Sequence, residues 1–254
     1  MAPNLPHLLV LGGTEEAYAL ASTLAGRDDL RLTTSLAGAT KQPRHPAGAH
    51  RIGGFGGKAG LAAWLVRERV TLLLDASHPF AGRIRAQARA AAAAAGIPCL
   101  RLERPPWRPG PGDVWRPVAD LDAGLAALEP LGRRVLAAIG TRALDRLAEA
   151  PMDFVVRGVD SPPHVPANVT FVEGRGPFGL ESERRLLEAH GIDAVLCRNS
   201  GGHGARAKLD AARERGLPVV MIERPNAAAL DAVPDVASAL LALDQRFFGR
   251  STWV

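Results

Sequence analysis

The sequence has little cysteine and no long apolar run. Its two cysteines, Cys99 and Cys197, lie in apolar, strand-like runs and form neither a CxxC motif nor a Cys/His spacing. A disulfide framework or a zinc site is therefore not expected, and we predict two reduced thiols and no metal. No stretch approaches the roughly 18 consecutive apolar residues of a membrane helix, and the amino-terminal residues lack the layout of a cleavable signal. We expect a cytoplasmic protein with no membrane partner.

Lysine is also scarce, so arginine supplies nearly all of the positive charge. The chain has a formal net charge of +5, and its lysines are Lys41, Lys58 and Lys208. This balance favours an anionic partner such as a nucleotide, a polycarboxylate or a nucleic acid. The basic residues are scattered and not interleaved with aromatic residues, which argues against a nucleic-acid partner. Lys208, within a predicted helix, is expected to be solvated.

Strand-like runs alternate with helical patterns along the whole chain. The first strand-like run, HLLVLGG, is followed by a helix from about Thr14, in which Ala17, Leu20, Ala21 and Leu24 recur at helical spacing. This alternation is typical of βαβ units, in which helices cover both faces of a parallel sheet. It predicts an α/β fold of the doubly wound, Rossmann or flavodoxin-like kind.

The second half of the chain repeats the order of segments of the first. GIPCLRLERPP at 96–106 reappears as GLPVVMIERPN at 216–226, and VLGGTEEAYALA at 10–21 reappears as AAIGTRALDRLA at 137–148. RIGGFGG at 51–57 parallels FVEGRGP at 171–177, and LLLDAS at 72–77 parallels VLCRNS at 195–200. Four matches in the same order predict two similar domains.

The predicted domains are residues 1–112 and 113–254. Their linker is placed in 105–118, where five prolines and two glycines interrupt regular structure. A last helix is predicted at about 236–248. It follows the second half, and its pattern is compatible with packing on either domain.

The first predicted strand ends in a turn suited to a nucleotide phosphate. Gly12, Gly13, Thr14 and Glu15 form a tight strand-to-helix turn, whose backbone N–H groups and helix dipole favour an anion. Thr14 replaces the second glycine of the dinucleotide fingerprint. Its hydroxyl is expected either to contact phosphate or to cap the helix.

The loop after the second predicted strand favours NADPH over NADH. An NAD site usually offers a carboxylate there, and the segment RLTTSLAG has none. Thr34, Ser35 and Gly38 suit a phosphate-bearing ribose, and Lys41 and Arg44 follow closely enough to add positive charge.

Two further loops complete the predicted cofactor side. Gly53 and Gly54, in a run with four glycines in five positions, leave the backbone bare for a flat ligand. After the strand at 70–74 comes the loop DASHPF, whose Asp75 and Ala76 are assigned to the cofactor. The side chains of Ser77 and His78 are candidate proton donors, as is bound water, and the sequence does not choose among them.

Seven segments together resemble the precorrin-6A reductase family over nearly the whole chain: LGGTEEAYALA, TTSLAG, RIGGFGG, DASHPFA, RLERPPW, GRGPF and NSGG. The resemblance implies two Rossmann-like domains, NADPH on one of them, and a tetrapyrrole in a cleft between them. It also implies reduction of precorrin-6A to precorrin-6B by hydride from NADPH and addition of a proton, without a metal or flavin. Two domains already form such a cleft, so a monomer suffices.

The substrate side is expected in the second domain, with Phe80 of the first facing the same ligand. Its candidates follow predicted strands and are rich in arginine, as suits a carboxylated ligand. They are Thr141, Arg142, Arg157, Arg175, Gly176, Asn199, Ser200 and Gly201.

One departure from the family pattern and two alternatives stand beside this prediction. Where the family commonly reads AGR after the second strand, this chain has Ala39, so that arginine's contact is lost or moved to Lys41 or Arg44. The alternatives are reduction of a cobalt-containing substrate and a bilobal nucleotide- or tetrapyrrole-binding module without catalysis.

Overall fold

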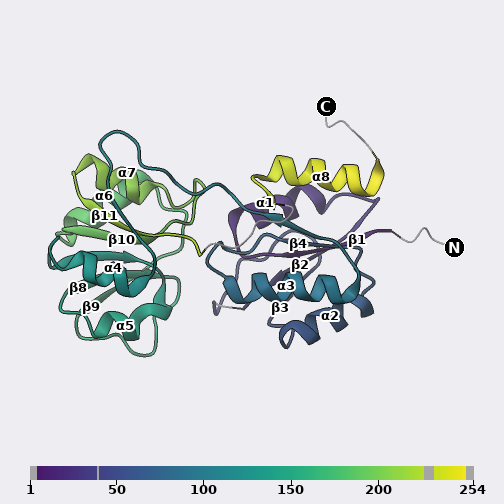
Figure 1. Cartoon of the computed structure of the whole chain (residues 1–254), viewed down its shortest axis with the longest axis horizontal. Helices are drawn as coiled ribbons and strands as arrows, with labels where there is room; N and C mark the ends of the chain where they lie inside the picture. The colour runs from purple at the N-terminus through teal and green to yellow at the C-terminus, as the bar shows by residue number, and fades with distance from the viewer. Residues whose placement is uncertain (1–4, 39, 226–231, 250–254) are drawn as a thin grey trace. The chain divides into compact units, whose positions relative to one another are not determined.

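The computed structural model describes residues 5–38, 40–225 and 232–249. The chain forms two compact units, Met1–Arg104 together with Ala227–Val254, and Pro105–Asn226, hereafter the first and second domains (Figure 1). The break expected after residue 112 therefore lies after Arg104. Trp107 explains the shift, because its indole is buried in the core of the second domain.

Each domain is an α/β fold built on a six-stranded parallel sheet. The sheet of the first domain has the order β12-β5-β4-β1-β2-β3. Its elements are β1 (His7–Leu11), α1 (Glu15–Leu24), β2 (Arg31–Leu36), β3 (His50–Ile52), α2 (Gly57–Arg67), β4 (Leu72–Asp75), α3 (Gly82–Ala95), β5 (Cys99–Leu102), β12 (Ala232–Val233) and α8 (Val236–Phe248).

The sheet of the second domain has the order β6-β11-β10-β7-β8-β9. Its elements are β6 (Val114–Val118), α4 (Leu121–Leu128), β7 (Arg134–Ala138), the 3-10 turn η1 (Thr141–Ala143), α5 (Leu144–Ala148), β8 (Asp153–Gly158), β9 (Val169–Glu173), α6 (Leu180–Ala189), β10 (Ala194–Arg198), α7 (Ala207–Glu214) and β11 (Pro218–Ile222). The doubly wound α/β prediction is confirmed in both halves.

The strand β1 shows how the first sheet is covered on both faces. Leu8 and Val10 point to the cluster that contains α1 and α8, whereas Leu9 and Leu11 point to the cluster that contains α2 and α3. Successive side chains of a strand face opposite sides, so a strand buried on both sides is apolar at every position. The apolar run LLVL at 8–11, all of it buried, is this pattern.

The strand pairing gives the correspondence between the two domains. In the first domain Asp75 lies level with Leu11 of β1 and with Arg101 of β5. In the second, Cys197 lies level with Ala138 of β7 and with Met221 of β11. Leu11 matches Ala138 and Arg101 matches Met221 in the sequence repeat, so Asp75 corresponds to Cys197. The parallel drawn between LLLDAS and VLCRNS is therefore wrong by one residue.

Each sheet has one edge strand that comes from the other half of the chain: β6 beside β11, and β12 beside β5. β6 follows β5 in sequence but pairs with β11, and β12 follows β11 in sequence but pairs with β5. The predicted linker therefore contains a strand, β6, and the edge position of this strand tolerates Pro117.

The last helix, α8, packs on the first domain. Ala239 and Leu243 are buried in the same cluster as Leu20 and Leu24 of α1 (Figure 1). An ion pair of 2.7 Å between Arg27 and Asp244 adds to this contact.

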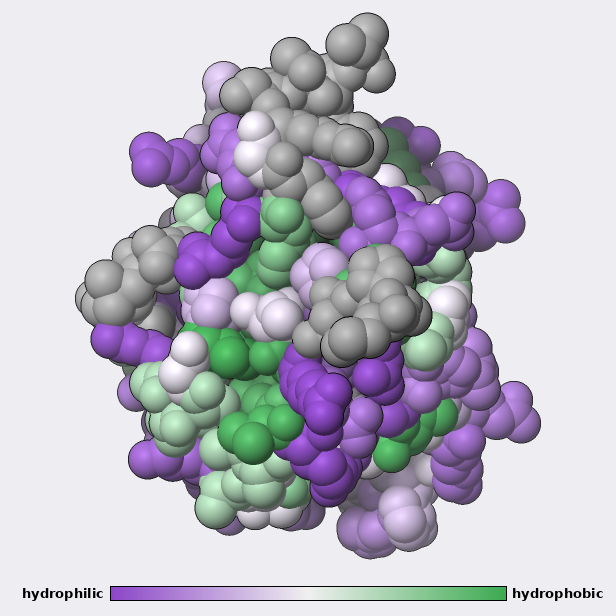
Figure 2. All heavy atoms as spheres, turned by 90° about the vertical axis from the view of Figure 1, so that its right-hand side faces the viewer, coloured by the Kyte–Doolittle hydropathy of each residue, from purple (hydrophilic) through white to green (hydrophobic). Residues whose placement is uncertain are grey.

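Exposed apolar side chains are scattered over the described surface. The large ones are Leu5, Ile52, Val66, Val114 and Leu241, and each comes from a different segment. Hydrophobic side chains lie between hydrophilic ones on the face drawn in Figure 2, as is ordinary for a protein surface. None of the described helices is long and apolar enough to cross a membrane.

Candidate active site

The switch point of the first sheet lies between β1 and β4, where the strand order reverses. In such sheets the loops after these two strands leave toward opposite faces, and the crevice at their carboxyl ends receives the ligand. Gly13 follows β1 with φ of +106°, and a Cβ added there would meet no heavy atom within 4 Å. The turn therefore has open space beside its backbone. At Gly12, by contrast, a Cβ would lie 3.0 Å from the Cγ2 atom of Thr34.

Thr14 joins the two loops of the switch point. Its hydroxyl donates to the carbonyl oxygen of Ala76 at 2.8 Å and accepts from the backbone N–H of Ala17 at 3.3 Å. Of the two roles open to Thr14, the structure shows the helix cap. The backbone N–H groups of Glu15 and Glu16, which precede Ala17 in α1, are the remaining candidates for binding an anion, because they have no partner within the helix. Glu15, in the same turn, is exposed.

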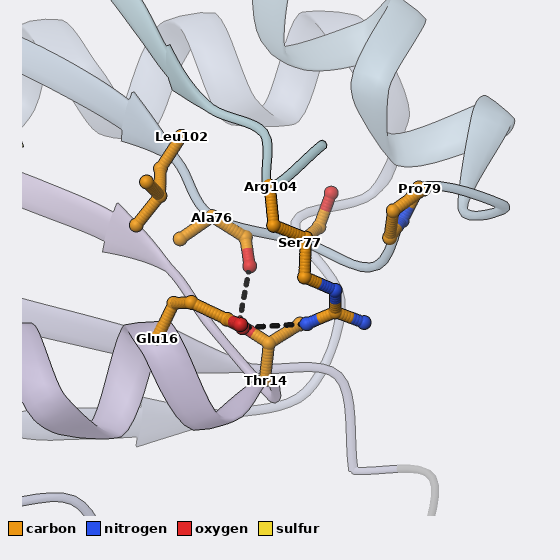
Figure 3. A pocket seen from close by; sticks show the side chains of 7 residues that line it. All are labelled: Thr14, Glu16, Ala76, Ser77, Pro79, Leu102 and Arg104. Atoms are coloured by element: carbon orange, nitrogen blue, oxygen red, sulfur yellow. Dashed lines mark hydrogen bonds and ion pairs between the residues drawn. The ribbon is translucent and has the colours of Figure 1, made fainter. Parts of the chain in front are cut away.

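A small hollow lies at this switch point (Figure 3). Its lining residues are Thr14, Glu16, Ala76, Ser77, Pro79, Leu102 and Arg104. Across it, Arg104 donates to Glu16 with an N–O distance of 2.5 Å.

Sequence reasoning placed Thr14, Ala76 and Ser77 at this site but missed Glu16 and Arg104. Arg104 follows the carboxyl end of β5, so the rule that selected the loops after β1 and β4 also points to it. Glu16 lies within the first turn of α1, in the motif that had been selected for its glycines. The signal for both residues was therefore in the sequence.

The loop after β4 is held by Asp75. One carboxylate oxygen of Asp75 accepts from the hydroxyl of Ser77 at 2.6 Å and from its backbone N–H at 3.0 Å. The other accepts from Arg101 at 2.8 Å. Asp75 is 2% exposed, so the loop is held by a buried carboxylate at the end of β4. Its assignment to cofactor binding stays a prediction.

His78 lies in the same loop with its tautomer fixed by a neighbour. Its Nδ1 atom accepts from the backbone N–H of Phe80 at 3.2 Å, and the two rings lie 5.9 Å apart. A ring nitrogen that accepts an N–H carries no proton, so neutral His78 holds its proton on Nε2. The hydroxyl of Ser77, in contrast, already donates to Asp75.

A buried ionic network supports these loops. Arg101 donates to Asp75 and, at 2.7 Å, to Glu103, which also accepts from Arg85 at 3.0 Å. Arg85 further donates to the carbonyl oxygen of Pro79. Burial is the main reason that the pKa of Arg85 is below its ordinary value, followed by the charge of Arg101. Through Arg85, the network reaches the backbone next to His78.

On the other side of β1, Arg51 organises the ends of β2 and β3. Its guanidinium donates to the hydroxyl of Ser35 at 2.9 Å and to the carbonyl oxygens of Gly53 and Gly54 at 2.8 and 2.9 Å. It also lies 3.8 Å from the centre of the Phe55 ring. Arg51 stands inside the selected motif RIGGFGG but was not singled out. It places a positive charge where the sequence predicted phosphate recognition.

The other residues assigned to this side lie farther apart. The side chain of Thr34 is buried at 1% exposure, and Gly38 has φ of +71°. Lys41 and Arg44 are exposed, and the Arg44 guanidinium lies 4.7 Å from the centre of the Tyr18 ring on α1. Ala39, where the family arginine is missing, lies outside the described residues.

In the second domain, two arginines stand at the switch point between β7 and β10. Thr141 and Arg142 begin η1 directly after β7, and Arg198 ends β10. Arg142 is exposed and Arg198 is half-buried. Burial first, and the positive charge of Arg142 second, lower the pKa of Arg198. Arg198 had not been singled out from the sequence.

Other substrate candidates of the second domain have structural contacts. Arg157 pairs with Glu183 at 2.6 Å, and Arg175 and Gly176 are exposed in the loop after β9. Asn199 accepts from the backbone N–H of Trp107 at 2.8 Å and donates to its carbonyl oxygen at 3.1 Å. The substrate roles of these residues stay predictions.

Two neighbours of Asn199 are also bound to the chain around them. The hydroxyl of Ser200 donates to the carbonyl oxygen of Arg198 at 3.2 Å. Gly201 has φ of +66°, and a Cβ there would lie 2.1 Å from the Pro105 carbonyl oxygen.

The prediction for Lys208 is wrong. Its side chain is buried at 5% exposure, donates to the carbonyl oxygen of Ala205, and lies 5.0 Å from the centre of the Trp107 ring. The long aliphatic stem packs in the core while the ammonium finds polar and aromatic partners. The position of Lys208 within its helix is the same whether its side chain faces solvent or packs on Trp107, so residue spacing alone does not distinguish the two.

Comparison with known proteins gives a consistent result. The family model of precorrin-6x reductase CbiJ/CobK matches residues 7–244. A precorrin-6A reductase of Rhodococcus erythropolis is 43% identical over 240 residues, which cover 93% of this chain and 96% of that protein. A cobalt-precorrin-6A reductase of Methanothermobacter thermautotrophicus is 28% identical over 239 residues, covering 86% of this chain and 76% of that protein.

A solved structure agrees with both. The structure of a CobK precorrin-6A reductase superposes with a TM-score of 0.91 at 40% identity, covering 98% of this chain and all of the other. This likeness extends through both domains. The chain therefore belongs to the precorrin-6x reductase family CbiJ/CobK.

Proposed function

We propose that the protein reduces precorrin-6A to precorrin-6B with NADPH, in the biosynthesis of cobalamin. The observation that carries this proposal is the open phosphate turn at the switch point of the first sheet, within a chain of this family. Relatives named for the metal-free substrate are 40–43% identical, whereas those named for the cobalt-containing substrate are 26–28% identical. This difference favours the metal-free substrate.

The first domain fits a nicotinamide dinucleotide phosphate. Gly13 leaves the backbone open beside the first turn of α1, where a pyrophosphate would be held by N–H groups. The end of β2 offers no carboxylate to a ribose, and Arg51 adds a positive charge beside Ser35. The adenosine half would lie over β2 and β3, and the nicotinamide half over β4 and β5.

The residues of the loop after β4 would then face the reacting atoms. When bound, NADPH supplies the hydride that is added to one end of the macrocycle double bond. Asp75 holds Ser77, so the Ser77 hydroxyl proton is already engaged. His78 is the side chain we assign to protonate the other end, as an imidazolium that returns to the neutral ring when it releases its proton. Hydride and proton together account for the two hydrogens gained.

The test is anaerobic absorbance at the nicotinamide band after mixing the protein with metal-free precorrin-6A and either NADPH or NADH. We expect oxidation that depends on the tetrapyrrole and prefers NADPH. R51M should weaken NADPH binding more than NADH binding, measured by cofactor fluorescence. Oxidation with the cobalt substrate alone would favour the anaerobic reaction. Binding of both ligands without oxidation would identify a binding module instead.

The proton donor has its own test. H78Q should lower kcat while the dissociation constant of NADPH stays unchanged, because His78 would act only in the chemical step. S77A serves as the matched variant in the same loop. A loss of kcat in S77A with none in H78Q would reverse the assignment.

A further inference from the structure

Tyr18, on α1, holds Arg44 through both its hydroxyl and its ring. The hydroxyl donates to the carbonyl oxygen of Arg44 at 2.8 Å, and the Arg44 guanidinium lies 4.7 Å from the centre of the ring. The first contact fixes the backbone of Arg44, and the second fixes the end of its side chain. Neither neutralises the guanidinium, because an aromatic ring stabilises a cation without pairing it with a negative charge. Arg44 is exposed, so its charge is held in place and accessible to an anion.

The loop that carries Arg44 is also fixed to the sheet. The next residue, His45, has its Nδ1 atom 2.8 Å from Nε2 of His50, the first residue of β3. One residue before His50, the carbonyl oxygen of Ala49 accepts from the backbone N–H of Thr34 in β2 at 2.9 Å. A group that is held before its ligand arrives loses less conformational freedom on binding. These contacts therefore prepare Arg44 to bind an anion.

The contact with Tyr18 places the Arg44 guanidinium near the amino-terminal end of α1. Tyr18 closes the first turn of this helix, because its backbone N–H donates to the carbonyl oxygen of the cap residue, Thr14, at 3.1 Å. Side chains of an α-helix lean toward its amino terminus, over the turn that precedes them. The Tyr18 ring therefore lies over the turn that begins at Thr14, at the same end of α1 as the open backbone of Gly13.

We propose that Tyr18 is a positioning residue for the choice of cofactor, which holds Arg44 for the phosphate that NADPH carries and NADH lacks. This inference rests on the proposed function for the identity of the cofactor. In a doubly wound sheet the adenosine ribose lies at the end of β2, beside the loop that contains Arg44. A guanidinium binds a phosphate through paired charged hydrogen bonds. Arg51 supplies one positive charge from β3, and Arg44 supplies a second from the side of α1.

The test compares the dissociation constants of NADPH and NADH, measured by cofactor fluorescence with the full chain. R44M should weaken NADPH binding by about tenfold, because it removes hydrogen bonds between charged groups, and should leave NADH binding unchanged. Y18L should weaken NADPH binding by about fivefold, and Y18F by about twofold because it keeps the ring and loses only the hydroxyl. The matched control is R31M, at the opposite end of β2, where the arginine side chain is 56% exposed. R31M should bind both cofactors as the unmodified protein does.

The double variant Y18L/R44M distinguishes positioning from a direct contact with the cofactor. Because Tyr18 acts through Arg44, the double variant should bind NADPH as R44M does, with no further loss. A further loss of the size seen in Y18L would overturn the inference. Equal losses of NADPH and NADH affinity in Y18L would assign Tyr18 a structural role in α1 and overturn it as well. R44M and Y18F keep the test valid if Y18L does not fold, because Arg44 is exposed and Y18F retains the ring.

Turnover separates this inference from the proposed function. NADPH binding that follows the expected order, without oxidation in the presence of precorrin-6A, would leave the role of Tyr18 standing and refute the reductase. An unmodified protein that reduces precorrin-6A but binds NADPH and NADH equally would leave the reductase standing and refute the role of Tyr18.

Discussion

Replacing Arg101 by methionine should selectively destabilise the first domain. Asp75 and Arg101 form a 2.8 Å ion pair in which their side chains are 3% and 12% exposed. Removing one partner of such a pair leaves a buried charge uncompensated and costs about 3–5 kcal/mol. The remaining contacts of Asp75 with Ser77 place the expected cost of R101M near the lower value. Because about 1.4 kcal/mol is a factor of ten, that cost corresponds to more than a hundredfold change in the opening equilibrium.

The assay is native-state hydrogen exchange, which resolves the two domains within one molecule. Amides of β4 and β5 should lose about two orders of magnitude of protection in R101M, and those of β10 and β11 should keep theirs. The double variant D75N/R101M should recover most of the loss, since it removes both charges and retains an oxygen that accepts from Ser77. The second domain has an apolar pair at these positions, with Cys197 Sγ 3.6 Å from Met221 Sδ.

Two results would refute this reasoning. Protection of β4 and β5 that falls less than about threefold in R101M would show that the pair contributes little, as exposed pairs do. A double variant no more stable than R101M would show that shape, and not an uncompensated carboxylate, explains the loss.

Three further predictions concern groups away from the ligand site. Burial is the main cause that lowers the pKa of His7. The contribution of His7 to stability is therefore complete above about pH 6.5, and it is lost as the pH falls through the lowered folded-state pKa. Urea titrations from pH 7.5 to 5 should show this loss, at most about 1.4 kcal/mol per pH unit, and H7Q should lack it. Burial raises the pKa of Cys197 to about 11, so a thiol reagent at pH 8 should leave Cys197 unmodified until the second domain unfolds, and modification at the rate of a free thiol would contradict this burial. Asp235 caps α8 by accepting from the backbone N–H of Ser238 at 2.7 Å. D235A should therefore speed hydrogen exchange in α1 and β5, whereas the equivalent cap variant D120A should speed it in the second domain. The reverse pattern would contradict the packing of α8 on the first domain.

Local pattern was sufficient to predict the elements that hold the candidate site. The four helical-period residues of α1, Ala17, Leu20, Ala21 and Leu24, are all buried. The continuous apolar runs became the central strands β1 and β4. The turn after β1 and the loop after β4 meet at a hollow because parallel strands bring their carboxyl ends to one edge. These features depend on residues close in sequence.

Long-range pairing explains what the sequence did not reveal. β12 contains two residues, too few for a periodic signal. It joins a sheet whose other strands all lie before residue 103 in the sequence. The one-residue error at Cys197 arose because similar letters were matched without a register, which only strand pairing defines. Lys208 shows the same limit, since its burial depends on Trp107, about a hundred residues away in sequence.

The repeat in this chain separates scaffold from chemistry. The exchanged units keep the same order: β12 and α8 follow β11 as β6 and α4 follow β5, and Asp235 and Asp120 cap the two helices in the same way. Since the scaffolds are alike, the difference between the domains must lie in the side chains at their switch points. Both domains have an open turn, at Gly13 and at Gly140, but the first has the small Ala76 where the strand register places Arg198 in the second. Substituting these few positions is therefore the direct way to tell a cofactor domain from a substrate domain.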